Sequence, residues 1–426
     1  FIPFLSLPQA RQTVRALGLC DRIKNIYLLA TEKIPDEVEG CEMLMIDSPA
    51  STATFRTIAL HADTAYTLLY TKYTAFEPGQ FAFERLLAIA GDTNAGMLYA
   101  DRYLLKNGNS QQAPVIDYQK GSLRDDFDFG SLLFFRSSVL KQAVRAMDAD
   151  YRFAGLYDLR LRVSELAELV HVNEYLYSEV ETDIRKSGEK LFDYVDPKNR
   201  AVQIEMESVC TAYLKRVGGY LAPGFEPISF DIDGFEQEAS VIIPVRNRIR
   251  TIEDAIRSVL AQKTTFRFNL IIVDNHSTDG TSEAIGKYTA DGRVVHLVPE
   301  RSDLGIGGCW NVGVHHPACG KFAVQLDSDD VYSGPDTLQK IVDAFYEQNC
   351  AMVVGTYRMT DFKMNEIPPG IIDHREWTPD NGRNNALRIN GLGAPRAFYT
   401  PVLRQINLPN TSYGEDYCLL YTSDAA

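Results

Sequence analysis

Two short apolar runs decide the fold of this chain: Ser240-Val-Ile-Ile-Pro-Val245 and Asn269-Leu-Ile-Ile-Val-Asp274. Both are rich in β-branched residues, and the second is continuously apolar in its middle, which is typical of a strand buried on both faces of a parallel sheet. Between them, Thr251-Ile-Glu-Asp254 has the pattern of a capping box and predicts a helix that continues to about Gln262. Strand, helix and strand at this spacing predict a βαβ unit.

The same alternation extends along the rest of the chain. In the second half it predicts strands at 294–298, 322–326 and 352–355, and helices that begin near 305 and at 337. In the first half it predicts helices at 9–19, 54–61 and 80–90, and strands at 26–29, 43–46, 66–70 and 97–100. The predicted fold class is therefore α/β, with mostly parallel sheets.

A segment that contains Pro and Gly separates the two halves. Asp196-Pro197 has the residue types of a helix start, and Gly218-Gly219 would end that helix. The stretch from Leu221 to Glu238 then has the composition of a linker. We expect one domain at 1–195, a connecting helix and linker at 196–238, and a second domain at 239–426 whose C-terminus looks incomplete.

The two halves resemble one another, which indicates an internal duplication. Leu69-Tyr-Thr-Lys72 aligns with Leu326-Asp-Ser-Asp329, and the order of matched segments is kept as far as Asp158 and Asp416. The halves differ in three carboxylates: where the second has Asp274, Asp327 and Asp329, the first has Ala30, Tyr70 and Lys72. We therefore expect a degenerate first domain. The alternative is a chance likeness of two α/β domains, because apolar strands are easily matched.

An acidic segment, Asp327-Ser-Asp-Asp330, directly follows a predicted apolar strand. Ligands bind at the carboxyl ends of strands in open parallel sheets, so these carboxylates are candidates for a ligand site. Their charges would repel one another unless a hard cation such as Mg²⁺ or Mn²⁺ held them together with a diphosphate. The alternative interpretation is a solvated acidic turn.

Two further acidic segments are candidates for chemistry. Asp274 ends a buried strand, where it could accept a hydrogen bond from a nucleotide base or ribose, or could simply precede a helix capped by Ser277 or Asp279. Glu415-Asp416 follows a turn signal, and it could supply a general base or only favour the positive end of a helix dipole.

Composition narrows the function classes. The formal net charge of −14 gives no general basic surface for nucleic acid. No apolar run approaches the roughly 18 residues of a membrane-spanning helix, and the N-terminus lacks the pattern of a signal peptide. The seven cysteines are scattered without a C-x-x-C pair, which favours reduced thiols and a cytoplasmic location.

Six segments together resemble the inverting glycosyltransferases of family 2, which have the GT-A fold. In family order they are 240–247, 271–281, Asn311-Val-Gly313, Asp327-Ser-Asp-Asp330, Gly391-Leu-Gly-Ala394 and Gly414-Glu-Asp416. The resemblance covers about 239–421. It implies two tandem GT-A domains, which are Rossmann-like nucleotide-diphospho-sugar transferase folds, with the first domain degenerate.

The resemblance also implies roles for individual residues. Asp416, with Glu415 beside it, would be the catalytic base, and Asp327 and Asp329 would bind Mn²⁺ or Mg²⁺. The nucleotide-sugar site would consist of Pro244, Val245, Arg246, Asp274, Asn275, Asn311, Asp327 and Ser328. The acceptor site would include Trp377, Gly393 and Ala394.

The implied function is metal-dependent, inverting transfer of a sugar from a nucleotide-diphosphate sugar, with UDP-sugars favoured, to a saccharide, a glycolipid-type acceptor or another hydroxyl. Such a protein would be cytoplasmic or peripheral at the inner face of the membrane. Two other interpretations stay open: a non-catalytic sugar-binding or scaffold protein, and a nucleotidyltransferase. A nucleotidyltransferase would have a Gly-rich loop after its first strand, and Val245-Arg-Asn-Arg248 lacks the glycines.

Overall fold

The computed structural model describes residues 1–33, 37–106, 108–180, 199–231, 234–373, 378, 380–389, 396–412 and 414. The chain forms two compact units, Phe1–Tyr220 and Leu221–Ala426. The division between them falls inside the segment 196–238 that the sequence marks as the connection. In the described part of the chain, no helix combines the length and the apolar character needed to cross a bilayer.

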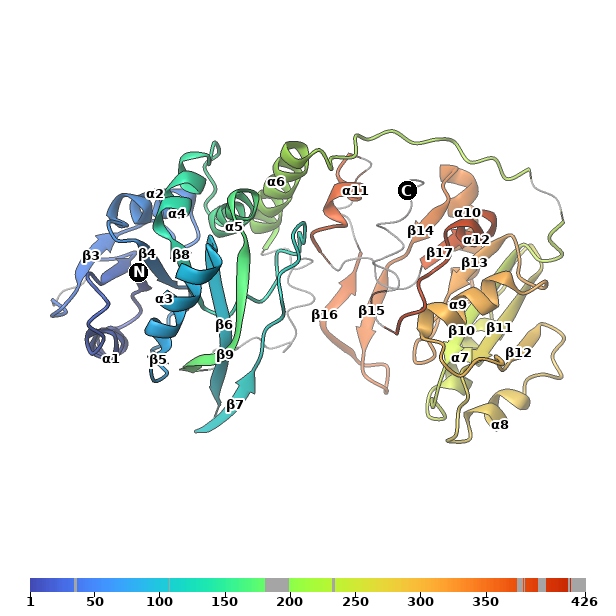
Figure 1. Cartoon of the computed structure of the whole chain (residues 1–426). Helices are drawn as coiled ribbons and strands as arrows, with labels where there is room; N and C mark the ends of the chain where they lie inside the picture. The colour runs from blue at the N-terminus through green and yellow to red at the C-terminus, as the bar shows by residue number, and fades with distance from the viewer. Residues whose placement is uncertain are drawn as a thin grey trace. The chain divides into compact units, whose positions relative to one another are not determined.

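A six-stranded sheet forms the centre of the second unit (Figure 1). Its strands lie in the order β12 (Val294–Leu297), β11 (Phe268–Asp274), β10 (Ala239–Val245), β13 (Phe322–Gln325), β17 (Arg396–Tyr399) and β14 (Met352–Val354). The first four are parallel to one another, and β17 runs antiparallel to both of its neighbours. β10 and β11 are buried along their whole length, which explains their continuous apolar sequences.

Helices cover both faces of this sheet. The side chains of β10 alternate between two apolar cores, with Val241, Ile243 and Val245 in one and Ile242 in the other. The first core is closed by α7 (Ile252–Leu260), α8 (Thr281–Gly286) and α10 (Thr337–Gln348), and the second by α9 (Ile306–His315) and α12 (Thr400–Ile406). The α/β prediction is confirmed.

A hairpin and a short helix complete the second unit. β15 (Tyr357–Thr360) pairs antiparallel with β16 (Glu366–Ile372). The short helix α11 (Gly382–Asn385) holds the beginning of the unit, because Asn384 exchanges two hydrogen bonds with the backbone of Leu221 (3.1 and 2.9 Å). Neither the hairpin nor α11 follows from the apolar pattern of the sequence.

The described residues of the first unit form two sheets. A parallel sheet has the order β1 (Ile2–Pro3), β2 (Tyr27–Ala30), β3 (Glu42–Met45). A mixed sheet has the order β4 (Tyr66–Tyr70), β8 (Leu132–Arg136), β6 (Met97–Lys106), β9 (Leu169–Val180), β5 (Phe76–Pro78), and β7 (Asn109–Ala113) pairs with β6. The helices are α1 (Leu7–Gly18), α2 (Thr52–His61), α3 (Ala82–Thr93), α4 (Ser137–Arg145), α5 (Gly155–Leu166) and α6 (Arg200–Val217). α6, the helix expected in the connection, packs against α5 of this unit.

The two units share one strand order. In the first unit the backbone of Phe1 bonds to Leu68 O (2.8 Å) and accepts from Tyr70 N (3.0 Å), which joins β1 to β4. The order β3-β2-β1-β4-β8-β6 therefore corresponds to β12-β11-β10-β13-β17-β14 in the second unit. A common strand order in two halves of one chain is what a duplication would leave.

Backbone hydrogen bonds at equivalent places support the same correspondence. At the end of β8, Arg136 N donates to Gly96 O (3.0 Å), and at the end of β17, Tyr399 N donates to Ala351 O (2.8 Å). A helix follows directly in both units, α4 after β8 and α12 after β17.

Most predicted elements are found within three residues of their predicted ends, except that β6 continues to Lys106. The capping box expected at Thr251-Ile-Glu-Asp254 was wrong. α7 begins at the expected place, but the Thr251 side chain does not cap it, and its hydroxyl donates weakly to Arg248 O (3.5 Å). The carbonyl of Arg248 also accepts from Ile252 N (3.0 Å), so the backbone starts this helix.

Candidate active site

The carboxyl ends of β10, β11 and β13 lie at one edge of the sheet because these neighbouring strands are parallel. Pro244 and Val245 are buried at the end of β10, opposite Val273 and Asp274 of β11. Arg246 follows them and is exposed. Of the residues predicted for the nucleotide site in this segment, the structure places only the side chain of Arg246 at the surface.

The loops after β10 and β11 are joined by side-chain hydrogen bonds. Asn247 N donates to Ser277 Oγ (3.0 Å), and Asn247 Oδ1 accepts from Thr278 N (2.7 Å). Two residues further along, Ile249 N donates to Asp279 Oδ2 (3.1 Å). Asn247 has φ of 55°, a left-handed conformation that Asn tolerates better than most residues. Asn247 therefore helps to join these two loops, a role that the sequence pattern did not assign to it.

Asp274 is completely buried between its own loop and α8. Its Oδ1 accepts from Ser277 N (3.0 Å), its Oδ2 accepts from the Ser282 hydroxyl, and His296 Nε2 lies 3.5 Å from Oδ2. Burial raises the pKa of Asp274, but the hydrogen bonds from Ser277 and Ser282 outweigh burial and hold the pKa below its ordinary value. The carboxylate thus organises the loop, and its predicted contact with a nucleotide stays a prediction.

Asn275 and Asn311 are both hydrogen-bonded to the backbone. Asn275 is 8% exposed, and its Nδ2 donates to Leu304 O (2.8 Å), just before α9. Asn311, on α9, donates to Leu408 O (2.7 Å) and accepts from Leu408 N (2.9 Å). The amide of Asn275 thus holds the segment before α9, and the amide of Asn311 holds the segment around Leu408 against α9. Their predicted contacts with a nucleotide stay predictions.

The Asp327-Ser-Asp-Asp330 segment extends from β13 at the same edge. Ser328 is buried, whereas a large fraction of the surface of Asp329 and of Asp330 is exposed to solvent. The carboxyl of Asp330 nevertheless lies among many protein atoms, and this desolvation, together with the charges of Asp327 and Asp329, raises its pKa to about 6. The neighbouring carboxylates therefore disfavour ionisation of Asp330.

One cation from another loop reaches this segment. Arg248 Nε lies 3.7 Å from Asp329 Oδ2, and both side chains are about half exposed. The contact joins the loop after β10 to the loop after β13. The three loops that follow β10, β11 and β13 are thus connected at one edge of the sheet.

The residue types of the acidic segment fit Mg²⁺ or Mn²⁺, because both ions prefer carboxylate oxygens. In the described ranges, the only trio of His, Cys, Asp or Glu ligand atoms within 4.8 Å of one another is Cys20, Asp21 and Glu84, in the first unit. The acidic segment therefore has no preformed three-carboxylate cage. Binding of an ion by two of these carboxylates, completed by phosphate oxygens, stays a prediction.

The chain that leads to the predicted base passes along the N-terminus of α9. Gly307 N donates to Thr411 O (3.1 Å), and Gly305 N donates to Asn410 Oδ1 (2.8 Å). A Cβ on Gly305 would collide with the backbone of Thr411 and Ser412, so the Gly residues at this helix start allow the close approach. Glu415 and Asp416 lie outside the described residues, as do the acceptor residues predicted at Trp377, Gly393 and Ala394.

The first unit has a different chemistry at the matched positions. Ala30 and Tyr70 are completely buried. Lys72 Nζ lies 2.5 Å from Oε1 of Glu179, a fully buried carboxylate that also accepts from Arg102 Nε (2.9 Å). An internal ion-pair network therefore stands where the second unit has Asp329.

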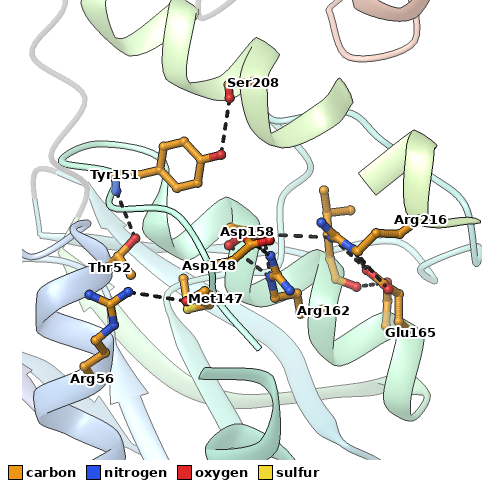
Figure 2. A network of polar contacts seen from close by, with 12 residues as sticks. Thr52, Arg56, Met147, Asp148, Tyr151, Asp158, Arg162, Glu165, Ser208 and Arg216 are labelled. Atoms are coloured by element: carbon orange, nitrogen blue, oxygen red, sulfur yellow. Dashed lines mark hydrogen bonds and ion pairs between the residues drawn. The ribbon is translucent and has the colours of Figure 1, made fainter. Parts of the chain in front are cut away.

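Asp158, which matches Asp416, is also tied into a network (Figure 2). It is 1% exposed, and both of its oxygens accept from Arg162 Nε (2.9 and 3.1 Å). Arg216 of α6 lies 3.9 Å from Asp158 and also pairs with Glu165 (2.8 Å). Burial raises the pKa of Asp158 even though Arg162 opposes that change. A carboxylate held in this way is poorly suited to remove a proton from a substrate.

Comparison with known proteins agrees with the assignment of the second unit. Residues 240–405 match the family model described as glycosyl transferase family 2. An uncharacterized glycosyltransferase of Rickettsia felis is 32% identical over 187 residues, which are 43% of this chain and 30% of that protein. A putative teichuronic acid biosynthesis glycosyltransferase of Bacillus subtilis, TuaG, is 33% identical over 120 residues, 28% of this chain and 46% of that protein. The chain thus spans less than half the length of these relatives.

Two solved structures have a weaker likeness. S. aureus TarS residues 1–349 in complex with UDP-GlcNAc is 23% identical, with a TM-score of 0.35 and coverage of 43% of this chain and 52% of that one. The mannosyltransferase PcManGT from Pyrobaculum calidifontis, in complex with GDP-Man and Mn²⁺, is 19% identical, with a TM-score of 0.33 and coverage of 50% and 58%. The family model and the curated relatives together identify residues 240–405 of this chain as a glycosyl transferase family 2 domain.

Proposed function

We propose that the second unit transfers a sugar from a nucleoside diphosphate sugar, preferably a UDP-sugar, to a hydroxyl of a saccharide or glycolipid-type acceptor, with inversion and with Mn²⁺ or Mg²⁺. The observation that carries this proposal is the connection of three loops at the carboxyl edge of β10, β11 and β13. This edge is where an open α/β sheet binds ligands. It also presents Asp329 and Arg246 at the surface.

Asp327 and Asp329 would hold the ion. When bound, it would neutralise charge that develops on the departing nucleoside diphosphate. The N-terminus of α9, a helix of ten residues, adds the positive end of a helix dipole beside the segment 410–412. Asp416 would remove the proton of the acceptor hydroxyl as its oxygen attacks the anomeric carbon, and a single displacement from the opposite face inverts configuration.

The class of acceptor is proposed from a relative. TuaG is named for teichuronic acid biosynthesis, and it matches 120 residues of this chain. Polysaccharide synthesis is therefore the setting that we propose for this unit as well. The sugar and the linkage do not follow from that likeness.

A panel of nucleotide sugars tests the proposal directly. The full chain is incubated with each donor, MnCl₂ and a set of oligosaccharide and glycolipid acceptors, and release of the nucleoside diphosphate and formation of the glycosylated product are measured. The matched control for Asp329→Ala is Asp343→Ala, which removes an exposed carboxylate from α10. Transfer by the parent and by Asp343→Ala, but not by Asp329→Ala, is expected. A parent protein that binds sugars without any turnover would favour the scaffold interpretation instead.

A further inference from the structure

Arg248 has a hydrogen-bonded backbone and a half-exposed side chain next to the acidic segment. Its N–H donates to Thr281 Oγ1 (2.9 Å), and its carbonyl accepts from Ile252 N (3.0 Å) at the start of α7. The side chain is half exposed, with a long contact from Nη1 to Asn247 O (3.4 Å) and the pair to Asp329 (3.7 Å). The position of Arg248 is therefore set by its backbone, while its guanidinium can exchange partners.

The ion pair between Arg248 and Asp329 is easily broken. Half-exposed pairs gain little because water screens them, and the 3.7 Å separation is longer than that of a strong charge-assisted hydrogen bond. The pair nevertheless blocks one of the two carboxylates that would hold an ion. A divalent cation that binds alone must displace the guanidinium, and it then lies close to a like charge.

We propose that Arg248 is a latch on Asp329 that couples the divalent ion to the diphosphate, an inference that rests on the proposed function. Without nucleotide the guanidinium of Arg248 pairs with the carboxylate of Asp329 and weakens binding of the ion. When ion and diphosphate arrive together, the guanidinium leaves Asp329 and pairs with phosphate oxygens, for which its planar set of N–H donors is suited. The two ligands therefore bind cooperatively, and by linkage each tightens the other by the same factor.

Binding measurements on the full chain test the latch without any turnover. The affinity of Mn²⁺ is measured by calorimetry and by electron paramagnetic resonance of the free ion, with and without saturating UDP, and again with GDP. The variants are Arg248→Ala, Arg248→Gln as a more conservative replacement, and Arg250→Ala as the control that removes an exposed cation from the same loop. The backbone hydrogen bonds of Arg248 do not involve its side chain, and unchanged circular dichroism verifies the fold of each variant.

The variants are expected to differ from the parent in Mn²⁺ affinity without nucleotide and in the gain that nucleotide brings. Without nucleotide, Arg248→Ala and Arg248→Gln bind Mn²⁺ about 3–10-fold more tightly than the parent, because a cation beside the site is gone. With UDP, the parent gains at least about 10-fold in Mn²⁺ affinity, and both variants lose most of that gain. Arg250→Ala behaves like the parent in both conditions.

The outcomes separate the latch from the donor site itself. If neither UDP nor GDP tightens Mn²⁺ binding to the parent, the proposed metal-dependent donor site is wrong. If nucleotide tightens Mn²⁺ binding in the parent but both Arg248 variants bind Mn²⁺ alone no more tightly than the parent, the latch is overturned and the donor site stands. Equal effects of Arg248→Ala and Arg250→Ala would reduce the result to general surface charge and would also overturn the latch.

Discussion

Asp329 and Asp330 are adjacent in the chain, but their surroundings differ, and we expect different effects when each is replaced. Asp329 is about half exposed, and its pair with Arg248 is long (3.7 Å), so a ligand that displaces the guanidinium can reach it. Replacing it should remove function without harming the fold. We expect Asp329→Ala to reduce transfer by at least about 10²-fold, and Asp327→Ala to have a smaller effect, because these carboxylates would serve the ion. Steady-state kinetics and melting temperature measure both effects, and transfer at the parent rate by Asp329→Ala would remove it from the metal site.

The role of catalytic base is proposed for Asp416 from its position in the Gly414-Glu-Asp416 motif. Asp416→Asn keeps the size of the side chain but cannot accept a proton, so turnover should fall by about 10²–10⁴-fold while donor binding is retained. Calorimetric titration of the donor and single-turnover kinetics separate the two effects. If Asp416→Asn loses donor affinity to the same extent as turnover, Asp416 is instead a residue of the nucleotide site.

The raised pKa of Asp330 predicts a pH-dependent stability. Because its pKa in the folded chain is about 6, above that of an unfolded Asp, the folded state favours the protonated form, and that stabilisation is lost as the pH rises through about 6. In EDTA, Asp330→Asn should therefore melt higher than the parent at pH 8 and equally at pH 4. After allowance for solvent screening the gain is on the order of 1 kcal/mol, or about 2–4 °C.

Differential scanning calorimetry at the two pH values measures this change, with Asp343→Asn on α10 as the exposed control. A gain of the same size at both pH values would trace the effect to packing and not to ionisation.

At the residue scale, the sequence predicted what depends on position along a strand. Asp327 and Asp329 follow an apolar strand, and parallel pairing then brings them to the carboxyl edge of the sheet without further information. The roles of Asn247 and Arg248 depend on contacts with residues about 30 and 80 positions away, which no local pattern encodes. Asp274 shows the same limit, because its burial and its bond to Ser282 appear only after α8 has packed.

The junction between α9 and the segment 410–412 is the element on which the predicted base depends. A Cβ on Gly305 would meet the backbone of Thr411 and Ser412, which cannot yield as a flexible side chain can. Gly305→Ala should therefore lower the free energy of unfolding by about 1–3 kcal/mol, or about 2–4 °C in melting temperature per kcal/mol.

Gly286→Ala, at the end of α8, is the matched control, since its Cβ would meet nothing within 4 Å. Chemical denaturation of both variants measures the difference. Equal stability of Gly305→Ala and Gly286→Ala would show that the segment 410–412 is not held against α9 in solution.

Helices and strands were predictable where their burial produces a recognisable pattern of apolar residues in the sequence. β10 and β11 are buried on both faces and therefore show unbroken apolar runs. β7 is polar and mostly exposed, so its sequence resembles a loop. β16 contains Pro368 and Pro369, which argue against a strand in any local analysis. Pairing with β15 supplies what the local sequence lacks.

For the whole molecule, the two units should differ in ligand binding. The first lacks the three carboxylates, and its Asp158 is tied to Arg162. Titration of the full chain with UDP and Mn²⁺ should therefore give one metal-dependent site per chain, and Asp329→Ala should remove it. A remaining metal-dependent site in Asp329→Ala would make the chain bifunctional, with a second donor site in the first unit.

The sequence predicts a duplication because five matched segments keep their order, and the strand order that the two units share agrees with that prediction. The place of α6 was not predictable. Its sequence indicates a helix between two domains, but only the contacts with α5, such as Arg216 with Glu165, place it in the first unit. Long-range pairing of this kind is absent from a local pattern.

The Lys72–Glu179 pair has a consequence for how the two units tolerate their environment. At the position where the second unit presents Asp329, the first unit has a positive charge that is part of the polypeptide, neutralised by a carboxylate that is completely buried. Because this charge belongs to a lysine side chain, neither a chelator nor a low manganese concentration removes it. Under the metal dependence proposed for the second unit, removal of the ion is therefore expected to stop transfer by that unit and to leave the folding of the first unit unaffected.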